Sequence, residues 1–262
     1  MIKKLALPVF LLLVVGLVGT AEASHSWGSY HWARTANPFT LKLGDNMSSA
    51  WDAHLATASS DWTASSVLNT SIASGLGGRN CKATLGRVEV CNRTYGSNGW
   101  LGIAQIWISG SHITQGVTKM NDTYFNTATY NTPAWKRFVV CQEIGHTFGL
   151  DHQDENFSNA NLGSCMDYTN DPDGGAGGAS ATDPSNEHPN AHDYAQLETI
   201  YAHLDSITTV LSSPPTKNGK AFLENRSEWG KAIKQDGKGR DSVFVKDFGK
   251  GEKVLTHVFW VE

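Results

Sequence analysis

The chain has 262 residues, a formal net charge of −4 and 40% hydrophobic residues, which suffices for one substantial domain with a small appendage. Aromatic residues are too sparsely interleaved with the lysines to indicate a nucleic-acid-binding module. The longest apolar run, residues 5–18, is shorter than the roughly 20 residues that a membrane span needs. We therefore expect no nucleic-acid partner and no membrane span.

The amino end has the pattern of a secretory signal peptide. Two lysines precede the apolar run, and alanines at positions 21 and 23 offer a small-residue cleavage site. We expect residues 1–23 to be removed and the mature, extracellular chain to begin near Ser24. Residues 24–37 form a short N-terminal segment, too short for a folded prodomain.

The first elements of the mature chain are a strand, a helix and a second strand. Residues 38–43 alternate as a strand, and residues 103–108 are also strand-like. Between them, apolar residues recur at helical spacing, and Ser48 or Ser49 is expected to cap this helix. The recurring residues are Trp51, Leu55, Ala58 and Trp62. His112 follows the second strand, and we interpret it as structural rather than as a ligand.

A longer helix is predicted to begin at Thr132, the cap, with Pro133 in its first turn. Its buried face is marked by Trp135, Phe138, Val139 and Phe148. From position 141 the sequence reads Cys-Gln-Glu-Ile-Gly-His-Thr-Phe-Gly-Leu-Asp-His. This run differs in one residue, Gln142, from the zinc-protease pattern His-Glu-x-x-His-x-x-Gly-x-x-His.

The residues of this motif have separate chemical roles. Positions 142 and 146 lie on one face of a helix, so both can reach one ion. Glu143 can act as general base on a metal-activated water, while a solvated helix glutamate is the alternative. Gly149 is expected to end the helix in a left-handed turn, so that the chain doubles back and delivers His152.

Residues 164–168 read Ser-Cys-Met-Asp-Tyr, and together with the helix motif they resemble the metzincin metalloproteases over roughly residues 38–205. The strand from Trp100 and the following His112 are similar to matrixins, whereas the methionine turn is more similar to pappalysins. The resemblance implies an α+β catalytic domain with a twisted mixed sheet, an active-site helix, a methionine turn and a closing helix. It also implies that Met166 supports the metal from below. In astacins and serralysins a tyrosine placed like Tyr168 binds zinc or stabilises the oxyanion.

Gln142 leaves the activity open. Its amide oxygen can reach as far as a histidine nitrogen, but zinc prefers imidazole, thiolate and carboxylate ligands. One interpretation is a working zinc endopeptidase in which Gln142, His146 and His152 hold Zn²⁺. Another is a secreted binding protein that keeps the fold without turnover.

The chain has four cysteines, an even number that favours disulfides in an exported protein. Three pairings are open. We prefer Cys81 with Cys91, closing a hairpin-like loop, and Cys141 with Cys165, joining the active-site helix to the methionine turn.

A glycine-rich stretch, residues 171–183, is either a Ca²⁺ site formed by its aspartates or a surface loop. A closing helix follows, capped by Asn190, with an apolar stripe of Tyr194, Leu197, Ile200, Tyr201 and Leu204. His188 and His192 are interpreted as surface residues. Auxiliary ligation by these two, or by His25 or His31, is the alternative.

Residues 207–218 are predicted to be a linker, and residues 219–262 a small basic segment with strands over 242–245 and 254–261. From residue 207 onward there are ten Lys and Arg against seven Asp and Glu, whereas the preceding mature part has nine against seventeen. These opposite charges favour docking against the catalytic part or an external surface, and a solvated tail is the alternative.

We therefore expect a monomeric, secreted zinc endopeptidase with its catalytic domain over residues 38–206. An extended protein or peptide substrate would lie along the edge strand of the upper subdomain. Glu143 would serve as general base and Tyr168 would steady the oxyanion.

Overall fold

The computed structural model describes residues 24–175, 181–211 and 222–262. The predicted signal peptide, most of the predicted linker and the middle of the glycine-rich stretch lie outside the described residues. Among the described helices, none has the length and apolarity needed to cross a membrane.

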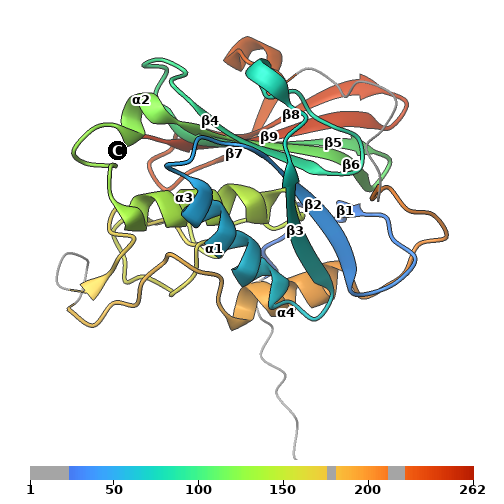
Figure 1. The fold of residues 1–262 in the computed structure, drawn as a ribbon, viewed down its shortest axis with the longest axis horizontal. Coiled ribbons are helices and arrows are strands. Elements are labelled where there is room, and N and C mark those ends of the chain that lie inside the picture. Colours follow the sequence, from blue (N-terminus) through green and yellow to red (C-terminus); the bar gives the residue numbers. More distant parts are fainter. Residues whose placement is uncertain (1–23, 176–180, 212–221) are drawn as a thin grey trace, which may run out of the picture.

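The described part of the chain folds into one mixed sheet with helices packed against it (Figure 1). The helices are α1 (Asp52–Thr63), α2 (Asp122–Phe125), α3 (Pro133–His146) and α4 (Ala191–Ile200), with short 3₁₀ turns at Gly78–Asn80 and Arg226–Glu228. The strands are β1 (His31–Trp32), β2 (Phe39–Asn46), β3 (Leu68–Ser74), β4 (Val88–Arg93), β5 (Trp100–Ser109), β6 (His112–Asn121), β7 (Lys231–Gln235), β8 (Asp241–Gly249) and β9 (Glu252–Trp260). The expectation of an α+β fold with a mixed sheet is confirmed.

Within the described residues the strand order is β3-β2-β4-β6-β5-β9-β8-β7, and β1 pairs with β6 off this path. The pairings among β1, β2, β3, β4 and β6 are parallel, whereas β5 is antiparallel to both β6 and β9, and the pairs β9–β8 and β8–β7 are also antiparallel. In Figure 1, α1 and α3 lie together on one side of the sheet, with α4 farther from it. The main hydrophobic core fills the space between the sheet and these helices.

Two of the three predicted helix caps are confirmed. The hydroxyl of Thr132 accepts a hydrogen bond from the backbone of Trp135 at 3.2 Å, and Asn190 forms a reciprocal capping box with Asp193 at the start of α4. The prediction of a Ser48 or Ser49 side-chain cap is wrong. Helix α1 has no side-chain cap, because its cap position is Trp51, and both serines lie before it in the turn that leads into the helix.

The carboxyl-terminal strands are part of the sheet. Strand β9 pairs with β5 from Trp100↔Trp260 to Ser109↔Glu252, so the solvated-tail alternative is wrong. Its Leu255 and Phe259 join the main core, and Val254 and Val258 join a second apolar cluster. Apolar residues on both faces explain why this strand lies inside a sheet rather than at its edge.

Both disulfides have the preferred pairing. Cys81 is bonded to Cys91, and Cys141 is bonded to Cys165. The first does not close a hairpin, because Cys91 lies on β4, which pairs in parallel with β2 and β6. The second joins α3 to the segment around Met166.

Candidate metal centre

The last turns of α3 bring Gln142, Glu143 and His146 beneath the sheet. The helix ends as expected, because Gly149 adopts a positive φ of 97°. A Cβ at this position would lie 2.4 Å from the carbonyl oxygen of Tyr30, so glycine is also required by space. The reversed chain then delivers His152 back to the helix.

The Nε2 atoms of His146 and His152 lie 3.1 Å apart. The Nδ1 of His146 is 2.9 Å from the carbonyl oxygen of Leu150, which can only accept, so Nδ1 carries the proton and Nε2 of the neutral ring presents a lone pair. His152 is oriented by its Nδ1, which contacts a carboxylate oxygen of Glu155 at 3.3 Å. Both rings therefore have the orienting partners that are typical of metal-binding histidines.

A third histidine, His257 on β9, joins this pair. Each of the three rings offers a nitrogen within 4.8 Å of the others. The ring centroids of His257 and His146 are 3.9 Å apart. These three residues could together hold a metal ion. In a tetrahedral zinc site with bonds of about 2.0–2.1 Å, neighbouring ligand atoms lie about 3.3 Å from one another.

The sequence motif could not reveal His257. It lies 105 positions after His152, beyond any metal-ligand spacing in the motif. The one local indication is its position in β9. His257 lies between Leu255 and Phe259 on the same face of the strand, and both of these neighbours are core residues.

His257 also contacts the two side chains that the sequence assigned to catalysis. Its Nδ1 lies 3.2 Å from Oε2 of Glu143, and its Nε2 lies 3.0 Å from the hydroxyl of Tyr168. The prediction that Glu143, His146, His152 and Tyr168 gather at one place therefore agrees with the geometry. The alternative of a solvated Glu143 is wrong, since this residue has no exposed surface.

Gln142 is oriented by a single hydrogen bond. Its amide nitrogen donates to the carbonyl of Cys165 at 2.9 Å, which fixes the amide orientation because a carbonyl accepts. Its Oε1 is buried and has no hydrogen-bond partner among the described residues. An unpaired buried acceptor costs about 1–3 kcal/mol, so a cation at this oxygen would remove a penalty. The imidazoles of the three histidines could hold a metal ion, and this oxygen is a further donor on the same helix as His146.

The methionine turn lies directly under α3. A Cβ on Gly145 would come within 2.6 Å of the sulfur of Met166, and the Cys141–Cys165 disulfide fixes this contact covalently. On the other side, the indole of Trp27 stacks on His146, with ring centroids 4.8 Å apart. The short N-terminal segment therefore helps to enclose the centre.

Burial controls protonation at the centre. It raises the pKa of Glu143 well above its usual value, and it lowers the pKa of His146 and of His257, helped by the neighbouring imidazoles. Burial also raises the pKa of the Tyr168 phenol, with nearby carboxylates adding to the effect. The imidazoles of His146 and His257 are therefore held in the neutral form that binds metals.

The strand that lies nearest to Glu143 in the sheet, β5, has no free edge. Strand β5 is not an edge strand, because β6 and β9 pair with its two sides, and the free edges of the described sheet are at β3 and β7. Strand β5 also lies against the carboxylate of Glu143, since a Cβ on Gly102 would be 2.5 Å from its Oε1. In this conformation no extended peptide can pair with β5, and the substrate position expected from the sequence stays a prediction.

Comparison with known proteins finds no matching family model and no matching curated protein. The site is therefore interpreted from its own geometry. The Ca²⁺ hypothesis stays a prediction, because residues 176–180 of the glycine-rich stretch lie outside the described residues.

Proposed function

We propose that the protein is a secreted zinc-dependent endopeptidase of metzincin type, held closed by its own carboxyl-terminal strand. The observation that carries this proposal is the 3.1 Å approach of the His146 and His152 Nε2 atoms beside Glu143, one turn away on α3. Two lone pairs at this distance repel unless a cation or a proton lies between them. A general base beside such a pair is the arrangement of a metallohydrolase.

The chemistry of the open form follows from these residues. A bound zinc ion would supply a Lewis acid for the scissile carbonyl and lower the pKa of a water molecule. Glu143 would take a proton from that water and return it to the leaving amine, a role that suits a carboxylate whose pKa burial has raised. The hydroxyl of Tyr168 would donate to the developing oxyanion.

The closed form has no place for this reaction. A catalytic zinc site keeps one position open, and here a third imidazole, that of His257, lies beside His146 and His152. The two ring nitrogens of His257 are also within hydrogen-bond distance of Glu143 and Tyr168. We infer that β9 stands where a substrate strand would pair with β5 and that His257 blocks the reactive groups.

A second candidate function is a zinc-stabilised binding protein without turnover. The tight packing of β9 favours this second function. The ring of Phe259 packs against Trp135, Phe138 and Tyr168, with centroid distances of 5.2–6.4 Å. A strand held this way is displaced only at a large cost in buried apolar surface.

The test is to release β9 while keeping the whole chain present. A recognition sequence for a specific protease is inserted within residues 212–221, Phe259→Ala weakens the docking, and cleavage of a quenched fluorescent peptide library is measured before and after nicking. We expect activity to appear after nicking and to be absent from the same protein with Glu143→Ala. If the nicked protein keeps its zinc and its circular dichroism spectrum but cleaves nothing, the binding-protein function replaces the endopeptidase.

A further inference from the structure

A second cluster of metal-binding side chains lies away from α3, where β1, the start of β6 and the chain after α4 meet. We propose that His31, His112, His203 and Asp205 form a structural zinc site. This inference does not depend on the proposed peptidase, because it uses none of that site's residues.

The distances from Asp205 to the three histidines, and the distance from His31 to His203, are close to those of a tetrahedral site. Oδ1 of Asp205 lies 3.4 Å from Nε2 of His31, 3.3 Å from Nε2 of His112 and 3.7 Å from Nε2 of His203. The Nε2 atoms of His31 and His203 are 3.2 Å apart. Zinc bonds of about 2.0–2.1 Å in a tetrahedron place neighbouring donors about 3.3 Å from one another.

The backbone places these side chains together. His31 and His112 are register partners in the parallel pairing of β1 with β6, so their side chains lie side by side. The rings of His112 and of His203 each meet the ring of His31 edge-on, with centroid distances of 5.0 and 4.6 Å. Edge-on rings direct their nitrogens towards a common point rather than stacking upon one another.

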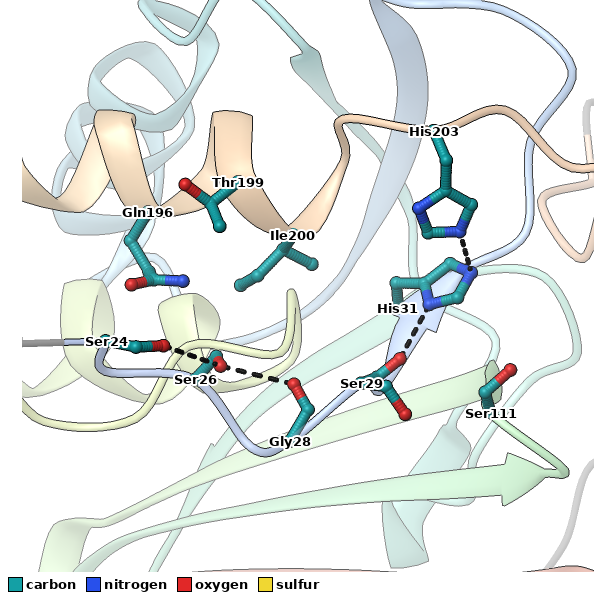
Figure 2. Close-up of a pocket in the computed structure, with 10 residues that line it drawn as sticks. All are labelled: Ser24, Ser26, Gly28, Ser29, His31, Ser111, Gln196, Thr199, Ile200 and His203. Atoms are coloured by element: carbon teal, nitrogen blue, oxygen red, sulfur yellow. Dashed lines mark hydrogen bonds between the residues drawn. The ribbon is translucent and has the colours of Figure 1, made fainter.

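The tautomer of His31 is fixed by its surroundings. Its Nδ1 lies 2.7 Å from the carbonyl oxygen of Ser29, which only accepts, so the proton is on Nδ1 (Figure 2). In the neutral ring Nε2 then has a free lone pair, and it faces the Nε2 of His203 and a carboxylate oxygen. This lone pair is satisfied by a proton on Nε2 of His203 or by a metal ion. A backbone carbonyl on the distal nitrogen is typical of zinc-bound histidines.

Asp205 is oriented by Arg34 so that one oxygen is left for the metal. The buried guanidinium of Arg34 binds Oδ2 at 2.9 Å, and its backbone amide donates to the same oxygen at 3.2 Å. Oδ1 is directed at the three histidines. A carboxylate held through its other oxygen loses little freedom when it binds a metal.

The site is accessible to an ion from solvent. A pocket of about 490 Å³ is lined by His31 and His203 together with residues of the N-terminal segment and of α4, as Figure 2 shows. The side chain of His203 is 56% exposed, whereas that of His31 is 5% exposed. Three imidazoles and one carboxylate suit zinc better than calcium or magnesium, which prefer oxygen ligands.

Four protein ligands leave no open position, so this zinc would be structural. It would join the amino-terminal segment, the sheet and the chain after α4, which are distant in sequence. A metal that binds only the folded state stabilises it by its binding free energy.

The test is the zinc content of the purified mature chain, measured after dialysis against metal-free buffer and repeated after addition of Zn²⁺. We expect two zinc ions per chain in the natural protein, one in His112→Ala/His203→Ala, and one in His146→Ala/His152→Ala. His188→Ala is the matched control, because His188 is half exposed and pairs with Asp61 outside both clusters. It should keep both ions.

A second measurement covers variants that fold poorly. His203→Ala alone removes an exposed side chain and should still fold, yet it should lose the zinc-dependent part of the melting temperature that His188→Ala retains. Cobalt bound to His146→Ala/His152→Ala should show the intense visible absorption of a tetrahedral site. The proposal is overturned if His112→Ala/His203→Ala keeps the zinc content of the natural chain, or if His146→Ala/His152→Ala binds no metal while folded. Loss of peptidase activity alone has no bearing on it.

Discussion

His257 and Glu143 are 114 residues apart in the chain, yet Nδ1 of His257 lies 3.2 Å from Oε2 of Glu143 and neither residue has exposed surface. The contact shows that β9 is part of the candidate metal centre. Strand pairing with β5 places Ala104 opposite His257, so the register of the sheet determines which residue of β9 meets α3.

Replacing His257 by alanine should open one coordination position. We expect His257→Ala to keep zinc through the remaining donors, with an affinity lower by about tenfold or more. In cobalt-loaded protein, acetohydroxamate should change the visible spectrum of the variant and leave that of the natural chain unchanged. Thr256→Ala, on the opposite face of β9, is the control, and a spectral response in the natural chain would show that the site is already open.

Restoring histidine at position 142 should strengthen metal binding. Imidazole is a better zinc ligand than an amide oxygen, so Gln142→His should raise the affinity by about tenfold or more, and Gln142→Ala should lower it. Competition with a chromogenic chelator measures both. Equal affinities in all three proteins would show that Oε1 of Gln142 does not contact the metal.

Phe259 should account for much of the docking energy of β9. Its side chain is fully buried among aromatic rings, and Phe259→Ala should reduce the free energy of unfolding by about 3–5 kcal/mol. Urea denaturation measures the change. Phe248→Ala is the matched control, because Phe248 is 54% exposed, and it should change stability by less than about 0.5 kcal/mol. Similar losses in the two variants would contradict the described seating of the strand.

The two disulfides should differ in their effect on the metal. Removing either should cost roughly 2–4 kcal/mol of stability. Only the Cys141→Ala/Cys165→Ala protein should also bind zinc more weakly. The bridge holds the backbone at position 165 against α3, and the carbonyl of that residue orients Gln142. Cys81→Ala/Cys91→Ala is the control for general destabilisation, and an equal loss of zinc affinity in both would remove the proposed link.

Asp167 should make the fold less stable as the pH rises. Burial, with the charges of Asp154 and Asp193, outweighs the hydrogen bonds from Leu162 and Asn186 and raises its pKa from 3.8 to about 6. The folded chain therefore holds this proton more tightly than the unfolded chain, and about 3 kcal/mol of stability is lost between about pH 4 and pH 6.

Asp167→Asn should remove this part of the pH dependence, since an asparagine oxygen can still accept the same hydrogen bonds. The measurement is urea denaturation across this pH range, with the exposed Asp173→Asn as control. An unchanged slope in Asp167→Asn would contradict the prediction.

The features that the sequence determined are local. A cap at Thr132, a left-handed glycine at position 149 and ligands one helical turn apart depend on a few consecutive residues. The pairing of Cys141 with Cys165 could be preferred for a similar reason, because the two cysteines lie within the helix motif and the methionine turn, which the resemblance already placed together.

Only the tertiary structure decided what completes and closes the centre. His257 and the cluster around Asp205 depend on strand register and on chain crossings between segments far apart in sequence, and no residue spacing records these. Whether β5 is an edge strand depends in the same way on the position of β9. Both faces of β9 carry apolar residues, so burying them inside the sheet lowers the free energy relative to exposing them in a solvated tail. The residue types for metal chemistry were therefore fixed by the sequence, whereas packing decided which of them meet.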